Sequence, residues 1–275
     1  MTASRRPTIG VFDSGVGGLT VLRALLEHIP GADYLYFGDT ARLPYGSKSA
    51  ATVAHYATGA TRFLQDEGAD LLVIACNTAT ALALDEIKAG SELGVIGVIE
   101  PGAGAAAAAS RTKRAVVLAT DATVGSHAYQ RALESKGVAV HEKACPLFVP
   151  LVEEGWTEHP VTEQVAGIYL AEAFSGESKD ADVLVLGCTH YPLILPLLRR
   201  LAPGHVTIVD SAGSTAHAVA GQLQNTPLRG GGGSGLGASP GIKFFATDSA
   251  EKFRKMGTRF LGQAVEDVVH VDLKE

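Results

Sequence analysis

The amino-acid sequence predicts an α/β protein that is built around mainly parallel β-sheets. Short apolar runs alternate along the chain with segments whose apolar residues recur at helical spacing, which is typical of repeated strand–helix–strand units. One unit occurs twice, at 69–78 and at 181–190, and each copy runs from Ala-Asp through an apolar stretch to a Cys with hydrogen-bonding neighbours. Because a parallel strand is buried on both faces, such continuous apolar runs favour parallel sheets.

Nine apolar runs are predicted to form strands. In chain order they span 8–12, 34–37, 71–75, 95–99, 115–119, 183–186, 206–209, 242–245 and 268–271. Segments between them, such as 19–29 and 51–64, predict helices. A Gly-rich segment at 229–241 is expected to form a solvent loop with no chemistry of its own.

The chain is long enough, at 275 residues, for two domains that each bury a core. Glu100-Pro101-Gly102 interrupts the alternation and precedes an Ala-rich helix at 103–109, so we expect the chain to cross into a second domain there. Residues 209–212 are expected to lead back. The predicted division is 1–99 plus 210–275 for the first domain, and 100–209 for the second.

The composition fits a compact globular protein, with 46% hydrophobic and 19% charged residues. A formal charge of −6 without a Lys/Arg cluster argues against nucleic acid as a partner. Three widely spaced Cys favour a reducing compartment over a disulfide framework. The N-terminus lacks the apolar core of a signal peptide, and no run of 18 apolar residues occurs, so we expect a cytoplasmic protein with no membrane span.

The two repeated units place Cys76 and Cys188 at the carboxyl ends of their strands, where an open α/β sheet binds ligands. Helix N-termini directly after them would favour a thiolate. A buried, unpaired Cys usually behaves as a small hydrophobe, and that is the alternative interpretation of each Cys alone. The duplication, with polar residues after both, favours a pair of facing thiols instead.

The segment from Asp13 to Gly18 follows the first predicted strand and contains three glycines. Its backbone N–H groups could face an anion, or the glycines could serve a structural turn. It matches neither the dinucleotide fingerprint, because Thr20 stands at the last Gly position, nor a phosphate-binding P-loop. Asp13 is the more informative residue, because a carboxylate at the end of a strand lies on the ligand side.

Two further loops follow predicted strands. Pro44 and Gly46 indicate a tight loop in which Tyr45 could line a small polar ligand, whereas Asp39 and Arg42 are more simply explained as an ion pair with each other. Thr120 and Thr123 follow the strand at 115–119. Their hydroxyls could cap the next helix or bind an ammonium or carboxylate group.

The remaining candidates have plain structural alternatives. Cys145 lacks a strand-end context and is interpreted as structural. Glu153 could be buried near a basic group, but a solvated helix face is the default. His190 stands out only because it follows Cys188 by two residues. The nine His form no metal-binding motif, and no lysine motif for pyridoxal phosphate occurs, so we expect no metal and no cofactor.

Taken together, these residues resemble the glutamate racemases of the cofactor-independent aspartate/glutamate racemase superfamily. The matching motifs lie at 10–18, 37–40, 44–46, 75–79, 145–153 and 186–192. They occur in the family's order and cover most of the chain. The Gly-rich segment 229–241 departs from the family's pattern but touches no motif.

The resemblance implies two similar α/β domains with the active site in the cleft between them, and it implies interconversion of L- and D-glutamate to supply peptidoglycan synthesis. Cys76 and Cys188 would be the two acid/base thiols, with Asp13 assisting Cys76 and with His190 and Glu153 assisting Cys188. The family often forms homodimers. The implied substrate-binding residues are Asp13, Ser14, Pro44, Tyr45, Gly46, Asn77, Thr78, Thr120, Thr123, Thr189 and His190.

The residues themselves suit this chemistry. Inverting an α-carbon requires a base on one face and an acid on the other, and donors must stabilise the charge that develops on the α-carboxylate. Aspartate and hydantoin racemases and maleate isomerases share the paired Cys and remain alternatives. A module that binds a dicarboxylate without turning it over is another, although two retained Cys argue against it.

Overall fold

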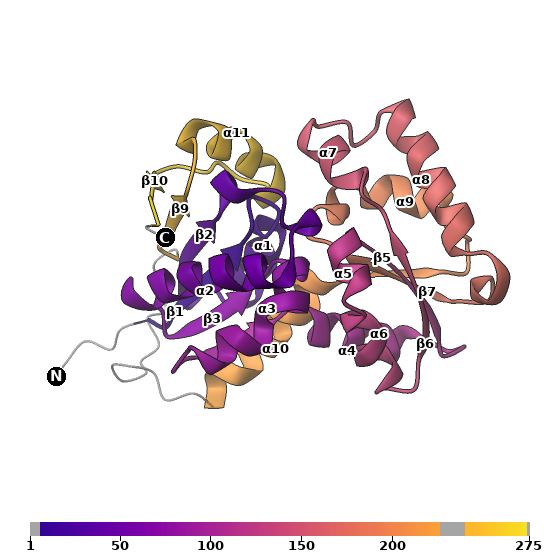
Figure 1. Cartoon of the computed structure of the whole chain (residues 1–275), viewed down its shortest axis with the longest axis horizontal. Coiled ribbons are helices and arrows are strands. Elements are labelled where there is room, and N and C mark those ends of the chain that lie inside the picture. The colour runs from indigo at the N-terminus through magenta and orange to yellow at the C-terminus, as the bar shows by residue number, and fades with distance from the viewer. Residues whose placement is uncertain (1–5, 226–239, 274–275) are drawn as a thin grey trace.

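The computed structural model describes residues 6–225 and 240–273, and their strands form two sheets that are parallel throughout (Figure 1). The first sheet has the order β10-β9-β2-β1-β3-β4, and the second has the order β6-β5-β7-β8. The strands are β1 (Thr8–Asp13), β2 (Asp33–Gly38), β3 (Leu71–Ile74), β4 (Gly94–Gly97), β5 (Arg114–Ala119), β6 (Ala139–Ala144), β7 (Val183–Gly187), β8 (Thr207–Asp210), β9 (Ile242–Ala246) and β10 (Val268–His270).

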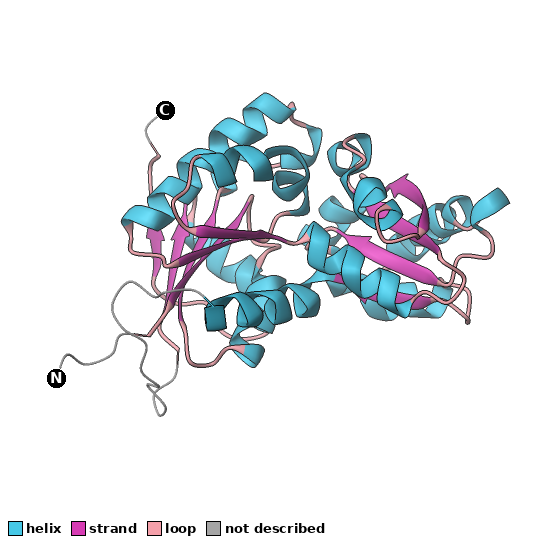
Figure 2. Cartoon of the chain, turned by 90° about the horizontal axis from the view of Figure 1, so that it is seen from below, coloured by secondary structure: helices cyan, strands magenta, loops and turns pink. Residues whose placement is uncertain are grey.

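Helices provide the crossovers between parallel strands, and Figure 2 shows the first sheet between two layers of them. The α-helices are α1 (Leu19–His28), α2 (Ala50–Asp66), α3 (Asn77–Ala89), α4 (Ile99–Ala109), α5 (Asp121–Gly125), α6 (Ala128–Glu134), α7 (Phe148–Glu153), α8 (Pro160–Ala173), α9 (Leu195–Leu201), α10 (Ser211–Asn225) and α11 (Ala250–Leu261). Short 3₁₀ turns are η1 (Thr40–Arg42), η2 (Tyr45–Ser47), η3 (Gly176–Ser178) and η4 (Tyr191–Ile194).

All nine predicted strands overlap observed ones, so the prediction of an α/β fold with parallel sheets is confirmed. The strand β6 was not predicted. Its sequence, Ala-Val-His-Glu-Lys-Ala, contains no apolar run, and none of its residues is fully buried. Because β6 is an edge strand that pairs with β5 alone, it needs no continuous apolar sequence.

The prediction that residues 100–102 interrupt the alternation of strands and helices is wrong, because these residues are helical. The preceding strand already ends at Gly97, and α4 begins at Ile99 and contains Pro101 in its first turn. Proline is tolerated there because the first N–H groups of a helix have no intrahelical partner. The helix that we expected at 103–109 is therefore four residues longer at its N-terminus.

The Asp of each duplicated unit fixes the beginning of a neighbouring strand. Asp70 Oδ2 accepts a hydrogen bond from the backbone N–H of Thr8 at 2.8 Å, where β1 begins. Asp182 accepts one from Ser110 Oγ at 2.7 Å, and two more from the next backbone N–H groups at 2.7 and 3.0 Å, just before β5. Burial raises the pKa of Asp182, but these hydrogen bonds outweigh it and hold the pKa well below its usual range. In both halves, an Asp just before the strand that leads to the Cys thus accepts hydrogen bonds from residues at or just before the beginning of the neighbouring strand.

Residues 8–97 and 242–270 supply the first sheet, and residues 114–210 supply the second. The chain passes between the halves through α4 and α10, which pack against each other. The exact division at 99/100 and 209/210 stays a prediction. Most of the Gly-rich segment 229–241 lies outside the described residues. No helix in the described part of the chain is long and apolar enough to cross a membrane.

Candidate active site

A cavity of about 330 Å³ lies between the two halves, at the carboxyl ends of both sheets. Open parallel sheets bind their ligands at this edge. The lining residues follow β1, β2 and β3 of the first sheet and β5, β6 and β7 of the second. They are Ser14, Leu43, Pro44, Tyr45, Gly46, Ser47, Cys76, Asn77, Thr78, Thr120, Asp121, Pro146, Val149, Pro150, Glu153, Glu154, Cys188, Thr189 and His190.

Cys76 occupies the N-cap position of α3, directly after β3. Its Sγ accepts a hydrogen bond from the backbone N–H of Ala79 at 3.4 Å, and its thiol donates to Ser14 Oγ at 3.5 Å. The N–H of Ala79, at the helix N-terminus, and the hydroxyl of Ser14 both lower the pKa of Cys76, because each can donate to the thiolate. Burial and the nearby charge of Asp13 outweigh them and raise the pKa of Cys76 to about 12. The helix N-terminus favours the thiolate of Cys76, as expected, but it does not offset burial and Asp13, so Cys76 is a protonated thiol near neutral pH.

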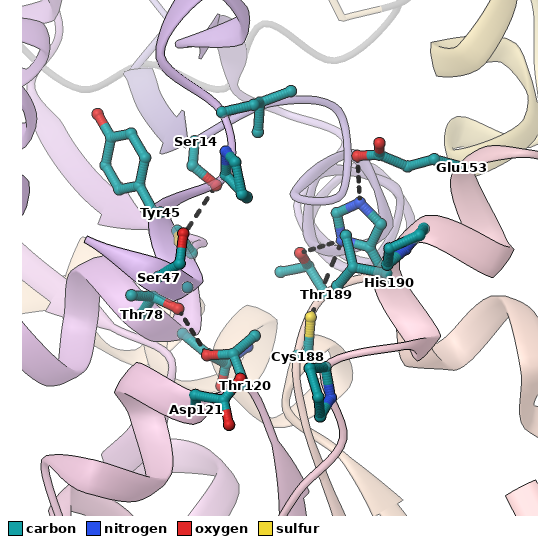
Figure 3. Close-up of a pocket in the computed structure, with 18 of the residues that line it drawn as sticks. Ser14, Tyr45, Ser47, Thr78, Thr120, Asp121, Glu153, Cys188, Thr189 and His190 are labelled. Carbon is teal, nitrogen blue, oxygen red and sulfur yellow. Dashed lines mark hydrogen bonds and ion pairs between the residues drawn. The ribbon is translucent and has the colours of Figure 1, made fainter. Parts of the chain in front are cut away.

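His190 lies between Cys188 and Glu153 on the opposite wall (Figure 3). Its Nδ1 is 3.9 Å from Cys188 Sγ, and its Nε2 is 3.2 Å from Glu153 Oε1. Burial lowers the pKa of His190, but the hydrogen bonds with Cys188 and Glu153 more than compensate and raise it to about 10. His190 is therefore an imidazolium at neutral pH. The Nδ1 side of this ring faces the Cys188 sulfur, and the Nε2 side faces Glu153.

The glycine-rich segment after β1 wraps around Asp13, and Ser14 is its residue that lines the cavity. The backbone N–H of Gly15 donates to Asp13 Oδ2 at 2.9 Å, and the backbone N–H groups of Ser14 and Gly18 also lower the pKa of this carboxyl. Burial is the larger effect, so the pKa of Asp13 is raised overall. The backbone N–H groups of this turn are thus directed at the chain's own Asp13 carboxyl group.

Asp13 lies beneath the cavity wall and does not line it. It is buried, and its Oδ1 has no hydrogen-bond partner among the described residues. Its charge acts on both sides of the site, because it raises the pKa of Cys76 and is itself stabilised by the positive charge of His190.

Three threonine hydroxyls join the two halves at the floor of the cavity. Thr78 Oγ1, at the beginning of α3, is 3.0 Å from Thr120 Oγ1 (Figure 3). It is 3.2 Å from Thr123 Oγ1. Thr120 also caps α5, because its Oγ1 accepts a hydrogen bond from the backbone N–H of Thr123. The capping interpretation of Thr120 is confirmed. Thr123 lies outside the cavity lining.

Asn77 is held by a residue of the other half. Tyr129 donates a hydrogen bond from its hydroxyl to Asn77 Oδ1 at 2.7 Å. This contact fixes the orientation of the amide and leaves its Nδ2 group, which is buried, without a partner among the described residues. An unpaired buried donor in a cavity wall is costly unless a ligand accepts from it.

The loop after β2 supplies Pro44, Tyr45 and Gly46 to the lining. The Tyr45 hydroxyl donates to Asp39 Oδ2 at 2.6 Å, and Arg42 pairs with Asp39 Oδ1 at 3.1 Å. The expected Asp39–Arg42 ion pair is confirmed. The hydroxyl of Tyr45 is thus engaged by Asp39 and points away from the cavity (Figure 3).

The cavity contains twelve of the predicted site residues and omits only Asp13 and Thr123. Sequence reasoning missed Leu43, Ser47, Asp121, Pro146, Val149, Pro150 and Glu154. Most of these are direct neighbours of predicted residues. The group at 146–150 follows β6, the strand that the apolar pattern did not reveal.

Cys145 is buried outside this cavity, and its carbonyl accepts a hydrogen bond from the Tyr191 hydroxyl at 3.1 Å. Burial raises the pKa of its thiol. These contacts support the structural interpretation of Cys145. Within 6–225 and 240–273, no group of three or more His, Cys, Asp or Glu residues is arranged to hold a metal ion.

Comparison with known proteins agrees with this architecture. The family model described as Asp/Glu/Hydantoin racemase matches residues 9–219. The glutamate racemase of Koribacter versatilis is 57% identical, over 98% of both chains. The crystal structure of glutamate racemase from Francisella tularensis in complex with D-glutamate has a TM-score of 0.87 at 34% identity and covers 98% of each chain. A glutamate racemase isoform from Bacillus anthracis has a TM-score of 0.90 at 34% identity, over 97% of this chain and 98% of that one.

The two parallel sheets and the thiol-bearing cavity between them thus define an amino-acid racemase. The chain belongs to the Asp/Glu/hydantoin racemase family and is similar over nearly its whole length to glutamate racemases.

Proposed function

We propose that the protein interconverts L- and D-glutamate by proton transfer between two cysteines and the α-carbon. The observation that carries this proposal is the placement of Cys76 and Cys188 in one cavity, after β3 of the first sheet and after β7 of the second. A substrate between the two walls would present one face of its α-carbon to each thiol. Removal of the proton on one face and delivery on the other inverts the centre.

The chemistry of the lining suits an amino acid with two carboxylates. His190 is the only cationic side chain among the described lining residues, so the carboxylates would be held mainly by neutral donors. Asn77 Nδ2 is one such donor, and the first N–H groups of α3 and α5 have no partner within their helices. Preplaced donors of this kind would also stabilise the negative charge that develops on the α-carboxylate.

The two thiols would be activated differently. Cys188 has the ring of His190 beside its sulfur, and Glu153 holds that ring; this pair would assist proton removal by Cys188. Cys76 has a pKa of about 12 in its buried setting, so it begins as the acid that delivers a proton. For the opposite direction, the positive charge of the substrate ammonium group in the cavity would offset the repulsion between Asp13 and Cys76 and favour the Cys76 thiolate.

Substrate choice is tested by following circular dichroism during incubation with L-glutamate and, in parallel, with L-aspartate. We expect glutamate to be turned over far faster. Aspartate is one methylene shorter, which would leave the groups around its distal carboxylate unpaired. Comparable kcat/KM values for the two acids would assign the protein to a racemase of broad specificity.

The assignment of faces is tested with β-chloroglutamate. Here a single base suffices: it removes the α-proton, the electron pair forms the Cα–Cβ double bond, and chloride leaves from Cβ. We expect Cys76→Ser and Cys188→Ser each to lose racemisation, because a serine hydroxyl is a poor base near neutral pH. Cys76→Ser should still release chloride from the L form, and Cys188→Ser from the D form. The assignment fails if both variants retain the same enantiomer, or if Cys145→Ser is equally damaging.

We further infer a homodimeric, cytoplasmic enzyme that needs no metal or pyridoxal phosphate, binds neither nucleic acid nor membranes, and supplies D-glutamate for peptidoglycan synthesis. The similarity to glutamate racemases supports these inferences, and the net charge of −6 supports the one on nucleic acid.

A further inference from the structure

Helix α11 contacts the His190–Glu153 pair through two consecutive residues. Arg259 Nη2 donates a hydrogen bond to the backbone carbonyl of Glu153 at 2.7 Å. The ring of Phe260 packs edge-on against the His190 ring, with 5.0 Å between the ring centres. Helix α11 follows β9 and precedes β10 along the chain, and it packs on α1 in the first half. His190 and Glu153 belong to the second half. The pair is therefore held from across the cleft.

The local backbone is shaped to admit the Arg259 side chain. Glu153 is the last residue of α7, where carbonyl groups have no donor within the helix. The chain then turns at Gly155, which has a positive φ of 80°. A Cβ atom at this position would lie 2.3 Å from Arg259 Nη1, so a side chain there would displace the guanidinium from its observed place.

We propose that Arg259 is a positioning residue for the reaction on the Cys188 face. By fixing the backbone of Glu153, it keeps the Glu153 carboxylate on His190 Nε2 and thereby keeps His190 beside the Cys188 sulfur. Cys76 does not depend on this contact, since its hydrogen-bond partners, Ser14 and Ala79, both belong to the first half of the chain. The proposal rests on the proposed function in one respect: that function assigns removal of the α-proton of the L enantiomer to Cys188.

The test replaces Arg259 with Ala and measures chloride release from the two enantiomers of β-chloroglutamate. Racemisation itself does not separate the faces, because its equilibrium constant is unity and both directions share one kcat/KM. We expect Arg259→Ala to lose roughly 10- to 100-fold in kcat with the L enantiomer, as is typical when a catalytic group is slightly misplaced. The rate with the D enantiomer should change less than about twofold.

Two further variants separate positioning from general damage. Arg254→Ala, on the exposed side of the same helix, should leave both rates unchanged, and Arg259→Lys should recover part of the L rate by donating one hydrogen bond. Equal losses with both enantiomers, or none with either, would overturn the proposal. Cys76→Ser and Cys188→Ser in the same assay test the two-thiol mechanism independently. If they fail to separate the enantiomers, the proposed function fails, while a one-sided loss in Arg259→Ala would still support a positioning role on one face.

Discussion

At the scale of single residues, burial and a few hydrogen bonds set different protonation states for groups that lie close together. His190 is positively charged near neutral pH because Cys188 and Glu153 hold it, whereas Cys76 is a neutral thiol because burial and Asp13 act against its thiolate. No sequence pattern reveals this difference, since both Cys follow similar strands. The sequence predicted which residues meet but not which of them are charged.

Replacing Glu153 with Gln should lower the pKa of His190 from about 10, because the amide removes the negative charge that faces Nε2. NMR titration of the imidazole measures this directly. The same change should reduce the free energy of unfolding. A raised histidine pKa stabilises the fold below the unfolded value of 6.5, and this stabilisation is lost as the pH rises through about 10. The difference from the wild type should therefore be largest near pH 6 and shrink towards pH 10.

Glu154→Gln is the matched control, since Glu154 is the next residue, lines the same cavity and makes no ion pair with His190 in the described structure. An unchanged His190 pKa in Glu153→Gln, or an equal fall in Glu154→Gln, would show that the Glu153 contact does not hold the charge.

At the scale of elements, the turn between β1 and α1 brings the two halves into contact. A Cβ atom on Gly17 would lie 2.3 Å from Thr189 Oγ1 and 2.5 Å from His190 Nδ1, both of them buried. Close approach of the two halves therefore accounts for the glycine at this position, which is the structural one of the two interpretations that the sequence offers. The sequence left these two interpretations open, because the partner of Gly17 is 172 residues further along the chain.

Gly17→Ala should lower the rate of racemisation by roughly 100-fold, because the added methyl group displaces His190 and Thr189. The rate is measured by circular dichroism, alongside the melting temperature. Gly59→Ala, in α2 with no atom within 4 Å of its added Cβ, provides the control. It should keep full activity and gain up to about 1 kcal/mol of stability. Normal activity in Gly17→Ala would contradict the close-approach interpretation.

At the scale of the whole molecule, the duplicated unit predicted much of the fold and site. Both Ala-Asp pairs anchor neighbouring strands, and both Cys reach the cavity at the carboxyl ends of β3 and β7. The contacts between the halves were not predictable. Tyr129 with Asn77 and Arg259 with Glu153 join segments that are 52 and 106 residues apart and share no pattern. The spacing of apolar residues predicts the type of each element and its buried face. These pairs depend instead on how the elements pack against each other in space.

The central claim is that two thiols act on opposite faces of one α-carbon, and incubation of L-glutamate in heavy water tests it most directly. At early conversion, the D-glutamate formed should carry deuterium at the α-carbon, while the recovered L-glutamate should remain almost entirely protiated. One thiol removes the original proton, and the other delivers a deuteron from solvent. Mass spectrometry after chiral separation measures both pools. Original protium in the product, or rapid deuterium uptake into the remaining L-glutamate, would indicate a single base and contradict the account.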